Sequence, residues 1–84
     1  MLKVYAAKWC PHCRQTVAHL TENQIEFEYI EIEEQSDDVI EKIVEVNGGD
    51  DWVVPTLEFN GKWREGKVYD KKGLDADLRQ LGVI

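Results

Sequence analysis

Two cysteines, Cys10 and Cys13, are the residues of this sequence whose type and spacing most directly imply chemistry. They are the only cysteines among the 84 residues, and they enclose Pro11 and His12. A C-x-x-C pair where a strand gives way to a helix is typical of a redox motif. In a first helical turn the Cβ atoms of residues i and i+3 are about 5–6 Å apart, so a small adjustment can close a disulfide. We expect the pair to open and close without a cofactor.

The two thiols are predicted to have different roles. Cys10 is expected at or beside the N-cap of the helix, where free backbone N–H groups and the helix dipole favour a thiolate. Cys13 lies one turn further in and should be less exposed and less ionised. Cys10 would then attack a substrate disulfide, and Cys13 would attack the Cys10 sulfur and release the reduced substrate.

Pro11 and His12 complete the predicted catalytic set. Proline is favoured at the first position of a helix. An imidazolium at His12 would stabilise the Cys10 thiolate and make the disulfide more oxidising. The alternative is that His12 is an exposed helix residue without any redox effect. The second histidine, His19, is interpreted as a surface or boundary residue of the same helix.

Apolar periodicity places the motif between a buried strand over Leu2–Ala7 and a helix from Pro11 to about Asn23. The later predicted elements are a strand over Ile25–Ile32, a helix capped by Ser36 or Asp37 that ends at Asn47-Gly48-Gly49, a strand after Pro55, its hairpin partner over Lys62–Tyr69, and a helix from about Leu74 to Leu81. The order β-α-β-α-β-β-α predicts an α/β fold in which helices flank a mixed four-stranded sheet. A chain this short is expected to form one domain over residues 1–84.

Charge and hydropathy exclude several classes of function. The formal net charge is −7, and no Lys/Arg run forms a phosphate-binding stripe, so we expect no nucleic-acid partner. No apolar stretch is long enough to span a bilayer, and no signal segment precedes the motif. These features predict a cytoplasmic monomer without membrane contact. One acidic cluster is interpreted as a solvated face: Glu31, Glu33, Glu34, Asp37 and Asp38.

The segments Trp9-Cys10-Pro11-His12-Cys13 and Val53-Val54-Pro55-Thr56 together resemble the glutaredoxin family and its neighbours, the NrdH redoxins and small glutaredoxin-like thioredoxins. The resemblance covers nearly the whole chain. It implies a thioredoxin fold and thiol–disulfide oxidoreductase activity on disulfide-containing proteins. It also implies that Pro55 is cis and lies beside the dithiol, with the backbone of Val54 pairing to the bound substrate.

Two departures from the family pattern concern the electron donor. Typical glutaredoxins follow the last strand with a Gly-Gly pair and an acidic residue that receives the α-amino group of glutathione, whereas this chain has 65–70 as Glu-Gly-Lys-Val-Tyr-Asp. The family's basic residue precedes the first cysteine by three positions, whereas Lys8 precedes Cys10 by two. The donor is therefore either glutathione or a reductase of the thioredoxin-reductase type, and we favour the flavoenzyme.

Aromatic residues supply candidates for a substrate groove. Trp9 directly precedes the first cysteine, as in thioredoxins, and Trp52 lies three positions before Pro55. Trp63 and Tyr69 alternate with polar residues and fit a groove or the packed sheet equally well. The predicted substrate-binding residues are Lys8, Trp9, Trp52, Val54 and Pro55.

A second hypothesis assigns Cys10 and Cys13 to a carrier of a metal ion or an iron–sulfur cluster. Two cysteines per chain cannot complete a four-ligand site, so such a carrier would share ligands across a dimer. Neither Trp9 nor the Pro-His spacer favours this function, and we predict no metal ligand. A third hypothesis, a binding module without catalysis, does not account for the presence of both thiols.

Overall fold

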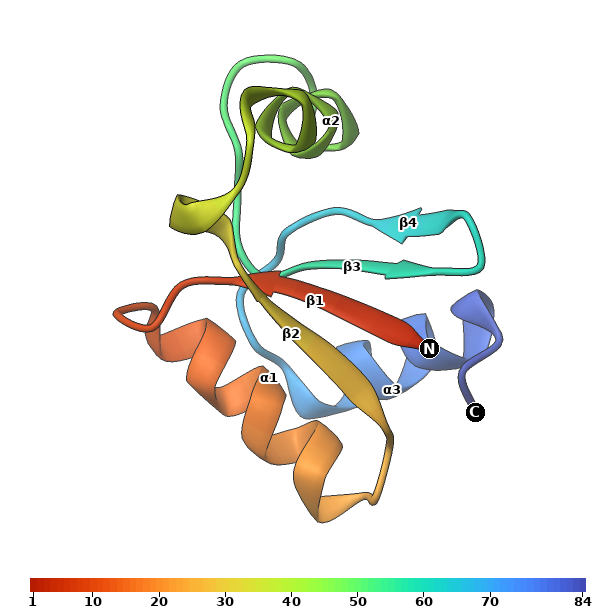
Figure 1. The fold of residues 1–84 in the computed structure, drawn as a ribbon. Helices are drawn as coiled ribbons and strands as arrows, with labels where there is room; N and C mark the ends of the chain where they lie inside the picture. The colour runs from red at the N-terminus through yellow and green to blue at the C-terminus, as the bar shows by residue number, and fades with distance from the viewer.

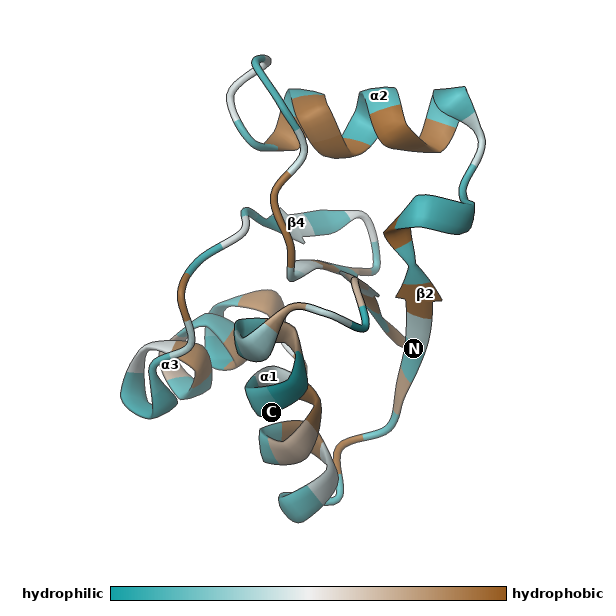
Figure 2. Ribbon diagram, turned by 90° about the vertical axis from the view of Figure 1, so that its left-hand side faces the viewer, coloured by the Kyte–Doolittle hydropathy of each residue, from teal (hydrophilic) through white to brown (hydrophobic).

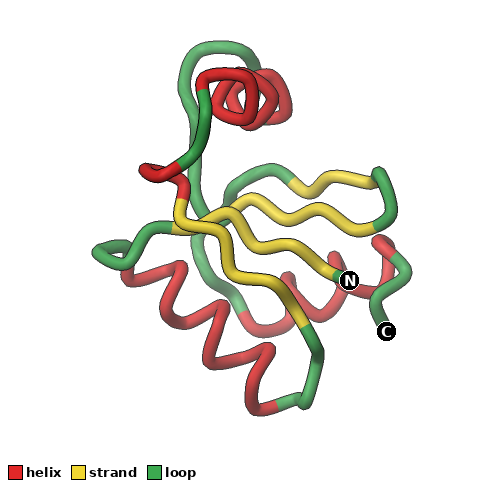
Figure 3. The backbone as a smooth tube through the Cα atoms, viewed as in Figure 1, coloured by secondary structure: helices red, strands yellow, loops and turns green.

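Strands and helices alternate along the chain in the order that the sequence predicts, and the computed structural model describes all residues from 1 to 84. The elements are β1 (Leu2–Ala6), α1 (Pro11–Glu22), β2 (Phe27–Glu31), the short 3-10 helix η1 (Ile32–Glu34), α2 (Asp37–Val46), β3 (Thr56–Phe59), β4 (Lys62–Arg64) and α3 (Lys71–Leu81) (Figure 3). None of the helices is both long and apolar enough to cross a membrane.

The four strands form one sheet in the order β2-β1-β3-β4. β1 runs parallel to β2, with Ala6 opposite Glu31, whereas β3 runs antiparallel to both β1 and β4. In Figure 1, α1 and α3 lie on one side of the sheet and α2 lies on the other. The prediction of an α/β fold with a mixed four-stranded sheet flanked by helices is confirmed.

The core is built from the central strand β1 and the helix faces that cover it. Val4 and Ala6 are fully buried in β1, and Leu78 of α3 and Ile43 of α2 are fully buried from opposite sides. Apolar and polar residues form alternating bands along α2, as expected for a helix with one face against a sheet (Figure 2). Each fully buried Leu or Ile contributes about 1.5–3 kcal/mol to stability.

The strand predicted over Ile25–Ile32 is shorter at both ends. The Ile25 N–H donates to the Leu20 carbonyl at 2.9 Å in the turn that closes α1. Ile32 begins η1 and is fully buried. Apolar alternation therefore continues through residues that the turn and η1 hold outside the sheet.

The strand predicted over Lys62–Tyr69 and the last helix also have different bounds. β4 ends at Arg64 because the next backbone groups bond elsewhere: the Gly66 N–H donates to Asn47 Oδ1 at 2.7 Å. α3 begins at Lys71 rather than near Leu74, because the Asp70 carboxylate caps it by accepting from the Gly73 N–H at 2.8 Å.

Candidate active site

The dithiol lies where β1 ends and α1 begins. Cys10 is the N-cap of α1, and its Sγ accepts from the Cys13 N–H at 3.2 Å. Pro11 takes the first helical position, as predicted. Both cysteines are free thiols, with 5% of Cys10 and 1% of Cys13 exposed. The N-cap is the position of a helix that best stabilises a negative charge.

Cys13 is held in its thiol form. Burial is the main cause that raises the pKa of Cys13 to about 12, and the hydrogen bond with Cys10 and the negative charge of Glu31 raise it further. At neutral pH the Cys13 sulfur therefore keeps its proton.

A cis peptide bond joins Val54 to Pro55 beside the dithiol, so the expectation drawn from the resemblance is confirmed. The Val54 carbonyl oxygen lies 3.9 Å from Cys10 Sγ. Two hydrogen bonds hold this loop: Thr56 Oγ1 donates to the Val53 carbonyl at 2.6 Å, and Asn47 Nδ2 donates to Thr56 Oγ1 at 3.0 Å. The Val54 backbone is thus fixed next to Cys10 Sγ.

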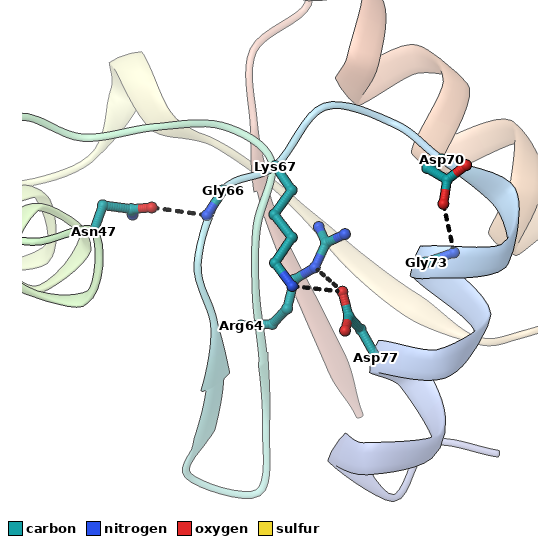
Figure 4. A network of polar contacts seen from close by, with 7 residues as sticks. All are labelled: Asn47, Arg64, Gly66, Lys67, Asp70, Gly73 and Asp77. Atoms are coloured by element: carbon teal, nitrogen blue, oxygen red, sulfur yellow. Dashed lines mark hydrogen bonds and ion pairs between the residues drawn. The ribbon is translucent and has the colours of Figure 1, made fainter.

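Asn47 joins this loop to the segment after β4, a role that sequence reasoning missed. Its side chain donates to Thr56 and accepts from the Gly66 N–H, which is one of the contacts drawn in Figure 4. A Cβ at Gly66 would collide with the side chain of Val53, so the close approach of the two segments requires glycine. In the sequence, Asn47 precedes two glycines, a pattern that indicates only the end of a helix.

His12 makes a backbone contact rather than a contact with a thiol. Its Nδ1 accepts from the Tyr69 N–H at 3.0 Å. An imidazolium has no lone pair at Nδ1, so this hydrogen bond requires the neutral ring. The influence of a charged His12 on Cys10 stays a prediction.

The prediction that His19 is a surface or boundary residue is wrong. Only 4% of His19 is exposed, its Nδ1 lies 2.9 Å from the Tyr69 hydroxyl, and its Nε2 lies 2.7 Å from Asp75 Oδ1. The reason is tertiary: α3 and the segment before it cover this side of α1, which the local sequence pattern cannot show. Tyr69, which could have belonged to a groove, packs edge-on against His19.

The remaining predicted binding residues are spread around the dithiol. Trp9 is 58% exposed, and its Nε1 donates to Glu33 Oε1 at 2.9 Å. Lys8 is exposed, and its backbone N–H donates to Glu31 Oε1 at 3.2 Å. Trp52 is half-buried, and its side chain packs against the core instead of projecting into solvent.

The structure decides between the two options for Trp63 and corrects the interpretation of Glu31. Trp63 stacks on Tyr5 with ring centroids 5.7 Å apart, so of the two options left open it takes sheet packing. The sequence pattern groups Glu31 with a solvated acidic face, but Glu31 is half-buried, unlike the other four members of that cluster. Its position at the end of β2 turns the carboxylate toward the sheet edge that carries the dithiol.

No cluster of three or more His, Cys, Asp or Glu side chains in the chain could hold a metal ion.

Comparisons with known proteins place the chain among proteins that share its fold. A family model described as glutaredoxin matches residues 2–63, from β1 into β4. The chain is similar to a glutaredoxin from Archaeoglobus fulgidus, with 28% identity and a TM-score of 0.71 over 93% of this chain and 85% of that one. It is also similar to a wheat glutaredoxin, with 28% identity and a TM-score of 0.66 over 99% of this chain and 83% of that one. No curated protein sequence matches it significantly.

Proposed function

The chain belongs to the glutaredoxin family, and on that premise we propose that it is a thiol–disulfide oxidoreductase in which Cys10 is the nucleophile and Cys13 the resolving thiol. One observation supports this assignment above all. Cys10 Sγ sits at the N-cap of α1 and accepts from the Cys13 N–H, with the Val54 carbonyl 3.9 Å away. The arrangement brings a helix-capping sulfur, a second thiol and the cis-proline loop together in one place.

The proposed reaction has two exchanges. The Cys10 thiolate attacks one sulfur of a substrate disulfide, and the other substrate sulfur leaves as a thiolate. Cys13 then attacks the Cys10 sulfur, so that the second substrate thiol leaves and a Cys10–Cys13 disulfide forms. A two-electron reductant returns the protein to its dithiol form.

The proposed substrates are disulfide-containing proteins. Trp9 and Val53 are large apolar side chains, 58% and 42% exposed, on the two segments that flank Cys10. Exposed apolar side chains around a reactive centre favour contact with an extended segment of another protein. Lys8 and the half-buried Trp52 would extend this contact surface. We place the activity in the cytoplasm, where dithiols are kept reduced, and assign it to the monomer.

For the electron donor we propose a flavoenzyme of the thioredoxin-reductase type rather than glutathione. Three residues of the segment after β4, Gly66, Lys67 and Asp70, already have polar partners within the protein (Figure 4). The Gly66 N–H donates to Asn47, Lys67 Nζ lies 3.1 Å from Asp77 Oδ2, and Asp70 caps α3. Asp70, the acidic residue at the end of this segment, is therefore already engaged in capping α3 rather than free to receive the α-amino group of glutathione.

A coupled assay tests both parts of the proposal. Disulfide reduction is followed through NADPH consumption, either with thioredoxin reductase or with glutathione and glutathione reductase, with Cys10→Ser as the control. We expect turnover in the first arm, and none above the Cys10→Ser background in the second. Turnover only with glutathione would reverse the donor assignment, and turnover in neither arm would contradict the reductase function.

A further inference from the structure

If the proposed function holds, the second exchange requires the buried Cys13 thiol to lose its proton, and the dithiol itself contains no group that accepts it. Cys13 must attack as a thiolate, yet its burial raises its pKa and favours the thiol form. A thiol whose pKa is raised by burial is ionised in only a small fraction of molecules at pH 7. A nearby group that takes the proton would remove this limit on the rate.

Glu31 is a carboxylate at the same edge of the sheet. It is the last residue of β2 and pairs with Ala6 of β1, the strand that leads into Cys10. Its Oε1 accepts from the Lys8 N–H at 3.2 Å and from the Tyr29 hydroxyl at 3.1 Å. Its Oε2 is buried and has no hydrogen-bond partner. A buried oxygen without a partner is costly, and such atoms cluster at functional sites.

Glu31, Tyr29 and Cys13 act on one another electrostatically. The negative charge of Glu31 is among the causes that raise the pKa of Cys13. Burial, the Glu31 hydrogen bond and Coulomb effects of Glu31, Cys13 and Cys10 raise the pKa of Tyr29 to about 12. The three groups therefore lie within electrostatic range of one another.

A surface pocket connects the thiol to the partner of the carboxylate. Cys13 and Tyr29 both line this pocket of about 390 Å³, together with Lys8 and Arg14. The pocket is large enough for water molecules, which can carry a proton between groups that do not touch. The other ionisable groups beside Glu31 are Lys8, before Cys10, and Glu33 and Glu34 of η1, all three exposed.

We propose that the Glu31 carboxylate accepts the proton of the Cys13 thiol when Cys13 attacks the mixed disulfide. The Cys13 S–H bond breaks, and the proton moves to Glu31, directly or through one water. The Cys13 sulfur bonds to Cys10 Sγ, and the bond between Cys10 and the substrate sulfur breaks. The substrate leaves with that electron pair as a thiolate, which then takes up a proton. The two protein thiols are oxidised and the substrate disulfide is reduced.

A single-turnover reaction with 5,5′-dithiobis(2-nitrobenzoic acid) separates the two exchanges. Cys10 attack releases the first coloured thiolate, and Cys13 attack releases the second, so stopped-flow absorbance gives both rates in one trace. Cys13→Ser identifies the second release. Glu31→Gln removes the proton acceptor, and Glu34→Gln is the matched control, because it removes one exposed carboxylate from the same short segment.

Glu31→Gln should slow the second release by about 10²-fold, the usual effect of losing a general base, while the first release and both rates of Glu34→Gln change little. Without the carboxylate, the second rate should also rise about tenfold per pH unit from about pH 6 to 9, following the ionisation of Cys13 itself. Glu31→Asp keeps a carboxylate and should recover part of the lost rate.

Four results would contradict the inference or the proposed function on which it rests. An unchanged second release in Glu31→Gln overturns the role of Glu31, as does an equal slowing of both releases or equal slowing in Glu31→Asp and Glu31→Gln. A second release that persists in Cys13→Ser instead overturns the proposed division of labour between the cysteines.

Discussion

Cys10 and Cys13 have the same side chain, and their surroundings make them different. Cys10 caps α1 and accepts a backbone hydrogen bond, whereas Cys13 is 1% exposed and has a pKa raised to about 12, chiefly by burial. Position in the first helical turn gives Cys10 its capping role, and the sequence predicts that position from the strand, Pro11 and the spacing. Local pattern is sufficient for that position, whereas the burial that raises the pKa of Cys13 comes from the packing of the fold.

Differential alkylation measures this contrast. Treated with iodoacetamide near neutral pH and mapped by mass spectrometry, the reduced protein should carry the label on Cys10 and almost none on Cys13. Since the pKa of Cys13 is raised, its thiolate fraction and its labelling rate should increase about tenfold per pH unit towards pH 12. Equal labelling of the two cysteines at pH 7 would contradict the assignment.

Other residues of the site could not be predicted, because their partners are distant in sequence. His19 contacts Tyr69 and Asp75, which are 50 and 56 positions away, and a lone histidine on a helix carries no local sign of either. Glu31 reads as one of several acidic residues, and only the fold shows that it alone is half-buried. Sequence patterns indicate which residues can do chemistry, and tertiary packing decides which ones are brought together.

At the scale of elements, acidic side chains of α3 form polar contacts with other parts of the protein. Asp77 Oδ2 accepts from Arg64 Nε of β4 at 2.9 Å and from Lys67 Nζ at 3.1 Å, as Figure 4 shows. Arg64 is 8% exposed, so its charge is largely desolvated. Asp75 of α3 bonds His19 of α1. These contacts hold the segment that passes beside His12.

Replacing Asp77 tests the link between β4 and α3. Burial alone would raise the pKa of Asp77, but the hydrogen bonds from Arg64 and Lys67 hold it below its usual range. Asp77→Asn leaves the buried Arg64 charge unpaired and should lower the free energy of unfolding by about 2–3 kcal/mol at neutral pH. Denaturant unfolding measures this loss.

The pH dependence of that loss follows from the direction of the shift. Because the folded-state pKa of Asp77 is depressed, its contribution is complete above the unfolded value of about 3.9 and disappears as pH falls through the folded value. Wild type and Asp77→Asn should therefore converge in stability in strong acid. Asp50→Asn, in an exposed loop, should show no gap at any pH. A gap that does not change with pH would contradict the ion-pair account.

Element order was predictable and element ends were less so. Helix starts follow local capping, and Ser36 caps α2 as expected, with its Oγ accepting from the Val39 N–H at 3.5 Å. β4 ends at Arg64, although the sequence pattern predicts a strand that continues to Tyr69. Its end is set by Asn47, which competes for the Gly66 N–H from another part of the chain.

At the scale of the whole molecule, the fold gathers the dithiol, the cis-proline loop and the end of β2 at one edge of the sheet. β1 and β2 are parallel, so their carboxyl ends meet there, and β3 starts there because it runs antiparallel to β1. In Figure 1 this edge lies where the turn before α1 leaves the sheet. Cys10, Val54 and Glu31 are each supplied by a different segment that the sheet topology brings to this edge.

The most direct test of this account is covalent trapping of the first exchange. The Cys13→Ser variant, incubated with a disulfide-bonded peptide, should accumulate a mixed disulfide that maps to Cys10 by mass spectrometry and is released by dithiothreitol. Cys10→Ser, which keeps the buried Cys13, should form no such adduct. An adduct on Cys13 in Cys10→Ser at a comparable rate, or no adduct on Cys10 in Cys13→Ser, would contradict the central claim.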